Sequence, residues 1–129
     1  MKLLDTCFLI HLQREWVRQQ PGPATRYLER HAAEEFGVSV ITTLEFLEGY
    51  RNPADGERFL DPFPQLAVTS QAARIGSRIR RDLRQKGEMI GDFDILIAAT
   101  ALETGRILVT DNARHFERIE GLAVETYRD

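Results

Sequence analysis

The stretch Phe93-Asp94-Ile95-Leu96-Ile97-Ala98-Ala99-Thr100-Ala101-Leu102, with Ile107-Leu108-Val109 close behind it, decides the fold class of this chain. The first segment is apolar nearly all round a helix, which predicts a buried helix that ends at Gly105. The second segment is short and wholly apolar, as is typical of a central strand in a parallel sheet. A buried helix beside a buried strand predicts an α/β fold with helices on both faces of the sheet.

Strand and helix signals alternate through the rest of the chain. Alternating and β-branched residues predict further strands at residues 2–4, 37–41, 66–68 and 121–127. Helices are predicted at residues 6–13, 23–34 and 44–50, and from Ser70 to Gly87, with Thr42 or Thr43 as the cap of the third. We therefore expect one domain, residues 1–129, with a three-layer α/β/α fold and a mostly parallel central sheet of about five strands.

The composition agrees with a cytoplasmic protein that has no membrane segment. The chain has 129 residues, of which 43% are hydrophobic and 29% are charged, so it can bury a core without a disulfide or a structural metal. Its single cysteine, Cys7, is expected to be a buried small hydrophobic residue. The longest apolar stretch, residues 95–102, is too short to cross a bilayer. The net charge of −3 argues weakly against a nucleic-acid partner, unless some carboxylates are reserved for cations.

Four acidic residues far apart in the sequence are expected to meet at one edge of the sheet. Asp5 follows the first strand, Glu45 lies in the first turn of a helix after the second, Asp94 begins the buried helix, and Asp111 follows a later strand. In a parallel sheet all strands end at the same edge, where open α/β sheets place their ligands. The sequence therefore predicts an acidic pocket there.

Each acid alone also has a structural explanation. Asp5 can cap the helix after it, Glu45 can be a surface residue, and Asp111 can belong to a turn. Asp94 is harder to explain in this way, because it interrupts an apolar run and a buried carboxylate without a role is costly. Their joint placement favours a site.

A pocket of carboxylates favours hard cations such as Mg²⁺ or Mn²⁺. The three histidines, His11, His31 and His115, lack the spacing of a zinc site, and no glycine-rich phosphate loop is present. Two such ions can activate water and stabilise the leaving oxygen of a phosphodiester. This chemistry points to a metal-dependent nuclease.

Several motifs resemble those of PIN domains of the VapC toxin type. They are Leu3-Leu4-Asp5-Thr6, Thr42-Thr43-Leu44-Glu45-Phe46-Leu47-Glu48-Gly49, Ile90-Gly91-Asp92-Phe93-Asp94 and Val109-Thr110-Asp111-Asn112. The resemblance implies a PIN-like fold and a metal-dependent endoribonuclease, the toxin of a type II toxin–antitoxin pair. By position, Asp5, Glu45 and Asp94 match the metal-binding acids of the family, and Thr6 and Thr110 match supporting hydroxyl residues.

The fourth acid and the substrate contacts stay open at this point. In many PIN domains the fourth acid stands where this chain has Asn112, one residue after Asp111, and we favour Asp111 because of its charge. Asp92 can cap the buried helix or line the outer pocket. Arg114 and His115, just beyond the acids, are candidate substrate contacts. The basic helix from Ser70 can be a solvated face or a contact for RNA phosphates.

The resemblance also implies partners. These are an RNA substrate such as tRNA or another structured RNA, an antitoxin protein that covers an apolar groove, and a second copy of the chain in a homodimer. The alternatives are a PIN nuclease in RNA processing or DNA cleavage, and a catalytically silent PIN module that binds RNA. A haloacid-dehalogenase phosphatase is disfavoured, because it needs a second aspartate where this chain has Cys7.

Overall fold

The structure is a computed structural model that describes residues 1–128, and the last residue of the expected domain, Asp129, lies outside them. The strands of the described residues are β1 (Lys2–Leu4), β2 (Phe36–Ser39), β3 (Gln65–Leu66), β4 (Leu108–Val109) and β5 (Val124–Glu125). The helices of that part are α1 (Thr6–Arg18), α2 (Pro23–Arg30), α3 (Val40–Leu47), α4 (Pro53–Leu60), α5 (Ser70–Lys86), α6 (Asp92–Thr104) and α7 (Ala113–Phe116).

The strands form one sheet in the order β3-β2-β1-β4-β5. The pairing is parallel throughout residues 1–128, with Leu4 opposite Val38 on one side and Val109 on the other. The predicted α/β class is confirmed, and the mostly parallel sheet is an all-parallel one. Because β1 lies at the centre, its carboxyl end lies in the middle of the edge where ligands of such sheets bind.

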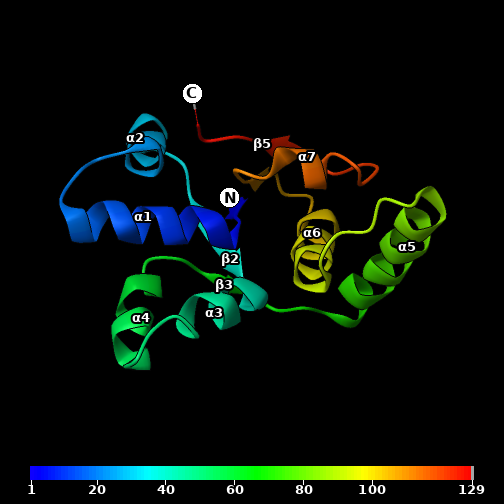
Figure 1. Cartoon of the computed structure of the whole chain (residues 1–129), viewed down its shortest axis with the longest axis horizontal. Helices are drawn as coiled ribbons and strands as arrows, with labels where there is room; N and C mark the ends of the chain where they lie inside the picture. The colour runs from blue at the N-terminus through cyan, green and yellow to red at the C-terminus, as the bar shows by residue number, and fades with distance from the viewer. Residues whose placement is uncertain (129) are drawn as a thin grey trace.

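Both faces of the sheet are buried, and alternate residues of the central strands point to opposite faces. Leu3 and Leu108 pack in one core cluster with α5 and α6, whereas Leu4 and Val109 pack in the other with α1, α2, α3 and α4. Figure 1 shows the α5–α6 pair on the opposite side of the strands from α1 and α2. Each fully buried leucine stabilises the fold by about 1.5–3 kcal/mol, which explains why these runs are wholly apolar.

Helices α5 and α6 approach closely because small residues line their contact. A Cβ added at Gly76 would lie 3.6 Å from Ile95 Cγ2 and 3.9 Å from Ala99 Cβ. Ile79 and Leu83 continue the buried stripe that the sequence predicts. The helix ends at Gly87, whose φ of 67° lies in the left-handed region that glycine adopts without strain.

The start of α3 differs from the prediction. Ser39, and not Thr42 or Thr43, is its N-cap, and its side chain accepts a hydrogen bond from the Ile41 amide at 3.0 Å. The predicted strand over residues 37–41 is therefore wrong beyond Ser39. The β-branched run Val40-Ile41 suggests a strand, but the serine cap satisfies a free amide of the helix start and turns the chain.

Helix α4 has no counterpart among the predicted elements. Its N-cap Asn52 accepts a hydrogen bond from the Ala54 amide at 3.1 Å, and Pro53 occupies the first turn. An Asn-Pro pair at these positions is a recognised helix start. Of the other elements, α1 runs five residues further than predicted and α2 ends at Arg30 rather than residue 34. Within residues 1–128 no helix is long and apolar enough to cross a membrane.

Candidate functional site

Asp5 stands at the carboxyl end of β1 and is almost fully buried, with 4% of its surface exposed. Its Oδ1 accepts a hydrogen bond from the Thr6 amide at 2.8 Å, so it caps α1. Its Oδ2 accepts one from Thr110 Oγ1 at 2.7 Å. Burial raises the pKa of this carboxyl group and the charge of Glu45 adds to the rise, whereas the hydrogen bonds lower it.

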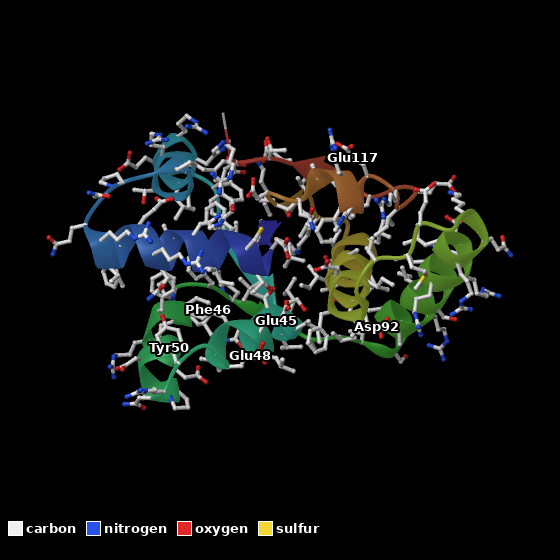
Figure 2. All side chains as sticks on the ribbon, viewed as in Figure 1. Glu45, Phe46, Glu48, Tyr50, Asp92 and Glu117 are labelled. Atoms are coloured by element: carbon white, nitrogen blue, oxygen red, sulfur yellow. The ribbon has the colours of Figure 1, made fainter. Side chains whose placement is uncertain are left out.

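Glu45 reaches the same edge from α3 and is half-buried. Its Oε1 accepts a hydrogen bond from Thr6 Oγ1 at 2.7 Å, and the same hydroxyl lies 3.0 Å from Thr42 Oγ1. Burial raises the pKa of Glu45, and the charges of Asp94 and Glu48 raise it further. Figure 2 shows Glu45 on the side of α3 that lies toward the centre of the molecule.

Asp94 lies in the first turn of α6 and is half-buried. No other described residue forms a hydrogen bond with its carboxylate. Burial raises its pKa and the charge of Asp5 raises it further, while His115 lowers it. The positive end of the α6 dipole favours an anion at this position.

These three acids form one electrostatic group. Asp5 acts on Asp94, Asp94 acts on Glu45, and Glu45 acts on Asp5, each by raising the pKa. In their present conformations, no group of three or more acidic, histidine or cysteine side chains in residues 1–128 is placed to hold a metal ion. A set of oxygen donors that repel one another fits a hard divalent cation, since its charge would offset the repulsion. Asp5, Glu45 and Asp94 are thus the residues that could hold such an ion.

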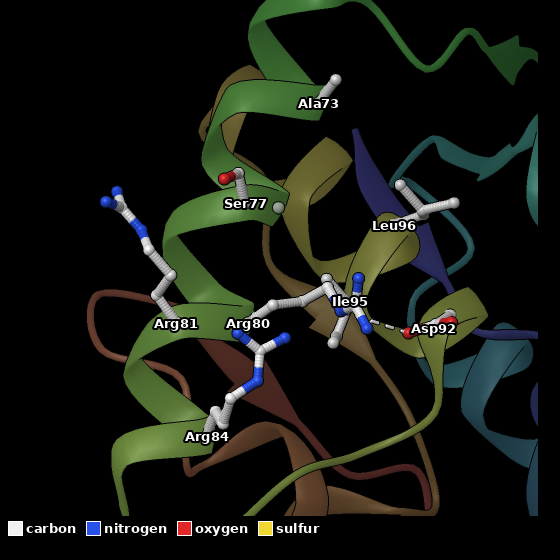
Figure 3. A pocket seen from close by; sticks show the side chains of 9 residues that line it. Ala73, Ser77, Arg80, Arg81, Arg84, Asp92, Ile95 and Leu96 are labelled. Atoms are coloured by element: carbon white, nitrogen blue, oxygen red, sulfur yellow. Dashed lines mark ion pairs between the residues drawn. The ribbon is translucent and has the colours of Figure 1, made fainter.

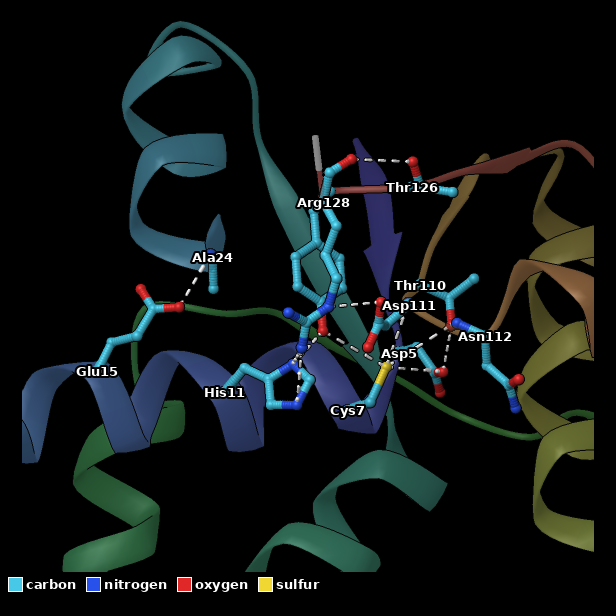
Figure 4. A network of polar contacts seen from close by, with 11 residues as sticks. Asp5, Cys7, His11, Glu15, Ala24, Thr110, Asp111, Asn112, Thr126 and Arg128 are labelled. Atoms are coloured by element: carbon cyan, nitrogen blue, oxygen red, sulfur yellow. Dashed lines mark hydrogen bonds and ion pairs between the residues drawn. The ribbon is translucent and has the colours of Figure 1, made fainter. Parts of the chain in front are cut away.

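The predicted fourth acid, Asp111, does not join this group. Its Oδ1 accepts a hydrogen bond from Arg128 Nε at 2.7 Å, and the same guanidinium group lies 3.3 Å from His11 Nδ1 (Figure 4). The side chain of the next residue, Asn112, points the other way and lies 2.7 Å from His115 Nδ1.

The remaining predicted residues surround the three acids at different depths. His115 is half-buried and acts electrostatically on Asp94. Arg114 is exposed on α7. Asp92 does not cap α6, since Gly91 is the N-cap; its carboxylate pairs with Arg80 at 3.4 Å. The capping interpretation of Asp92 is therefore wrong.

Three residues near the acids have contacts that the sequence does not predict. Cys7 Sγ lies 3.3 Å from Asp5 Oδ2, and burial raises the pKa of this thiol to about 11, so it remains a donor to the carboxylate. Cys7 is thus half-buried: it packs against the core cluster of α1 to α4, as expected of a small hydrophobic residue, and also contacts a polar group. Thr42 is fully buried beside Thr6, and Arg128 holds Asp111. Of these three residues, only Thr42 was singled out in the sequence, as part of the Thr42-Thr43 pair that precedes Glu45.

The geometry agrees with comparisons to known proteins. Residues 2–122 match the model of the PIN domain. The chain belongs to the PIN-domain family. The family predicted from the motifs is thereby confirmed, and the match extends over nearly all of the chain.

The relatives of this PIN domain are VapC proteins. Ribonuclease VapC19 of Mycobacterium tuberculosis is 36% identical over 90% of this chain and 92% of that protein. The tRNA(fMet)-specific endonuclease VapC of Salmonella typhimurium is 36% identical over 70% of this chain and 74% of that protein. In the solved structure of DNA-bound VapBC from Salmonella typhimurium, a chain with 29% identity superposes with a TM-score of 0.83, covering 98% of this chain and 99% of that one.

Proposed function

We propose that this chain is a Mg²⁺- or Mn²⁺-dependent endoribonuclease of the VapC type, and the toxin of a type II toxin–antitoxin pair. Its family membership and the names of its relatives support the ribonuclease activity. The observation that carries the metal dependence is the group of Asp5, Glu45 and Asp94, three carboxyl groups from three segments that raise one another's pKa.

In the proposed reaction, Asp5, Glu45 and Asp94 would hold the cation at the carboxyl edge of the sheet. When bound, the ion would supply an activated water and stabilise the charge on the leaving oxygen of the phosphodiester. The Thr110 and Thr6 hydroxyls would orient Asp5 and Glu45, because each donates a hydrogen bond to one carboxylate. Both oxygens of Asp5 already accept a hydrogen bond, so this carboxylate would meet the ion through a remaining lone pair. Asp94 has no such donor, so its carboxylate is free to turn toward the ion.

The substrate-side residues are proposed from their positions. His115 lies close enough to Asp94 to influence its charge, so it is placed to contact the phosphate under attack. Arg114, exposed on the same short helix, is placed to bind a neighbouring phosphate. Asn112 fixes the orientation of the His115 ring. Asp111 becomes the fourth acid only if Arg128 releases it.

The proposal is tested with purified, antitoxin-free protein and end-labelled total RNA, in the presence of Mg²⁺, Mn²⁺ or EDTA. We expect cuts that require the cation and that disappear in Asp94→Asn. Glu103→Gln is the matched control, since it neutralises an acid at the far end of the same helix. Cleavage in EDTA, or equal cleavage by Asp94→Asn, would contradict the mechanism. Cleavage of DNA but not RNA would favour the DNA alternative, and RNA binding without cleavage would favour a silent module.

An antitoxin partner is proposed for the apolar groove between α1 and α4. The groove has a volume of about 700 Å³, and its lining includes Leu12, Trp16, Tyr50, Phe59 and Phe63. Trp16, which is 74% exposed, and Val17, which is 68% exposed, belong to the same lining, and a contiguous exposed apolar patch marks an interaction site. Similar chains have been solved as VapBC complexes, so we assign the groove to an amphipathic segment of the antitoxin.

This assignment is tested by titrating the chain with the product of the neighbouring gene. Trp16→Ala should weaken binding by about 2 kcal/mol or more, as for aromatic anchors at interfaces. Phe93→Ala, which removes an exposed aromatic ring from α6, serves as the control. Equal binding by both variants would place the antitoxin elsewhere. The homodimer remains a prediction that sedimentation velocity can check.

A further inference from the structure

We propose that the hollow between α5 and α6, here called the arginine groove, binds phosphate groups of the RNA beside the cleavage site. It is lined by Arg80, Arg81 and Arg84, with Ala73, Gly76, Ser77, Asp92, Ile95 and Leu96. The inference rests on the proposed function, because it assigns the segment of substrate that flanks the bond to be cut. The proposed function itself does not require it.

The groove has the form of an anion site with an apolar floor. Its volume is about 410 Å³, enough for a phosphodiester group and part of its sugar. The floor forms where small residues of α5 meet α6 at Gly76 and Ile95. Figure 3 shows the Arg80 side chain extending from α5 toward Asp92 at the start of α6, with Arg84 further along α5. Planar guanidinium groups bind phosphate oxygens through paired hydrogen bonds.

The charges of the groove are poorly balanced within the chain. Helix α5 carries six basic residues and one acid, Asp82, which pairs with Lys86. In the described part of the chain neither Arg81 nor Arg84 has an ion-pair partner. Arg80 pairs at 3.4 Å with Asp92, but the side chains are 47% and 71% exposed, so an incoming phosphate can compete for Arg80.

The spacing of two of these arginines costs a little helix stability, which a bound anion would offset. Arg80 and Arg84 stand four residues apart on one helix face, where like charges destabilise a helix. A phosphate placed between them turns this repulsion into two attractive contacts. The net charge of the whole chain is −3, so the positive charge of the groove is a local feature of this face.

The groove also reaches the N-terminal end of α6, which is the end that carries Asp94. Asp92, at its rim, and Asp94, in the acidic group, both lie in the first turn of that helix. An α-helix with its side chains is about 10–12 Å across, so a strand can pass round the start of α6 from the groove to the acids within a few nucleotides. The same strand can therefore contact both sites.

Arg78 provides a matched control on the same helix. It is exposed, as Arg81 and Arg84 are, but it lines a separate hollow with Asp82 and Glu120. Replacing it removes one positive charge from α5 without changing the arginine groove. A general effect of net charge on RNA binding would therefore appear in Arg78→Ala as well.

The test measures binding of a labelled RNA hairpin with single-stranded tails to Asp94→Asn protein in EDTA, over a range of salt concentrations. In this background we expect Arg81→Ala and Arg84→Ala each to weaken binding severalfold. The slope of log affinity against log salt should also fall in magnitude by about 0.7–0.9 per lost phosphate contact. Arg84→Lys should keep most of the slope, and Arg78→Ala should behave as the parent protein.

Equal slopes for Arg84→Ala and Arg78→Ala would overturn the proposal, as would a change of oligomeric state in the groove variants, seen by sedimentation. The outcome is separable from that of the proposed function. If the parent chain does not cleave RNA but the groove variants lose binding, the groove stands and the nuclease assignment fails. If the parent chain cleaves and the groove variants bind and cleave like Arg78→Ala, the groove assignment alone fails.

Discussion

Two threonine hydroxyls donate hydrogen bonds to the carboxylates of the acidic group. Thr6 Oγ1 donates to Glu45 at 2.7 Å, and Thr110 Oγ1 donates to Asp5 at 2.7 Å. Each threonine is buried, so its hydroxyl needs a partner and the carboxylate supplies one. Groups that orient metal-binding residues in this way are often nearly as important as the ligands themselves.

The first prediction at this scale concerns Thr110. Thr110→Val keeps the volume of the side chain but removes the donor to Asp5, and it should weaken Mn²⁺ binding about 10–100-fold. Thr110→Ser keeps the hydroxyl and should restore most of the affinity. Isothermal titration calorimetry measures both. Equal affinities for the valine and serine variants would show that Thr110 only fills space.

The second concerns Asp111, whose carboxylate Arg128 holds at 2.7 Å. If Asp111 is the fourth acid, Arg128→Ala frees it and should strengthen Mn²⁺ binding, while Asp111→Asn should weaken binding and slow RNA cleavage. Calorimetry and the cleavage assay provide the two measurements. If Mn²⁺ affinity and RNA cleavage were unchanged in both variants, Asp111 would not be the fourth metal-binding residue, and Asn112 would be the remaining candidate.

At the scale of secondary-structure elements, the position of Glu45 depends on how α3 begins. Ser39 is the last residue of β2 and also the cap of α3, so strand and helix join without a loop. This junction places Glu45 in the second turn of α3, above the end of β1. A helix that began at Thr42 or Thr43 would present a different face at residue 45.

Removal of this cap gives the third prediction. Ser39→Ala should lower the free energy of unfolding by about 1 kcal/mol, because the Ile41 amide loses its acceptor. Thr43→Ala should have a much smaller effect, since the Thr43 hydroxyl bonds only to Gln65 on the surface. Urea denaturation measures both. If Thr43→Ala lowered the free energy of unfolding more than Ser39→Ala, Thr43 would be the cap, as the sequence suggests, and the prediction would be wrong.

At the scale of the whole molecule, the acidic group makes stability depend on pH and on cations. The folded-state pKa values of Asp5, Glu45 and Asp94 are raised. Ionising them therefore costs more in the folded protein than in the unfolded chain. Their contribution to stability is present below the ordinary values of about 3.9 for Asp and 4.3 for Glu, and it is lost as pH rises through the raised values.

The fourth prediction follows for Asp94→Asn in EDTA. At neutral pH the variant should melt a few degrees above the parent chain, and the difference should vanish as pH falls below the ordinary value of an aspartate. Other carboxyl groups, such as Glu15 and Glu125, have lowered pKa values that act in the opposite direction. They are common to both proteins and cancel in the difference.

Added cations should reverse the order of the two melting temperatures, so that the parent chain melts above Asp94→Asn. Mg²⁺ or Mn²⁺ stabilises the form that binds it, so the melting temperature of the parent chain should rise while that of Asp94→Asn changes little. Differential scanning calorimetry measures both effects. A variant that is less stable than the parent chain in EDTA at neutral pH would contradict the repulsion between these acids.

The sequence by itself determined the class of the fold and which three acids lie together at the candidate site. A helix that is apolar nearly all round, such as 92–104, is recognisable from its own residues as a buried helix. The short apolar strands are recognisable in the same way, because a strand buried on both faces of a sheet has a continuous apolar sequence. The order of strands and helices also indicates which residues follow each strand, so the convergence of Asp5, Glu45 and Asp94 at one edge could be predicted although the end of β2 was placed two residues too late. The motif resemblance added the family.

Only the tertiary structure decided which way the side chains around the acidic group point. Asp5 meets Thr110 across 105 residues, and Arg128 turns Asp111 away from the acids across 17. The arginine groove exists because small residues let α5 approach α6, and no periodicity within α5 tells which arginines will line it. Such contacts depend on how distant segments pack, and hydrophobic patterning records only whether a residue is buried, not which residue it meets.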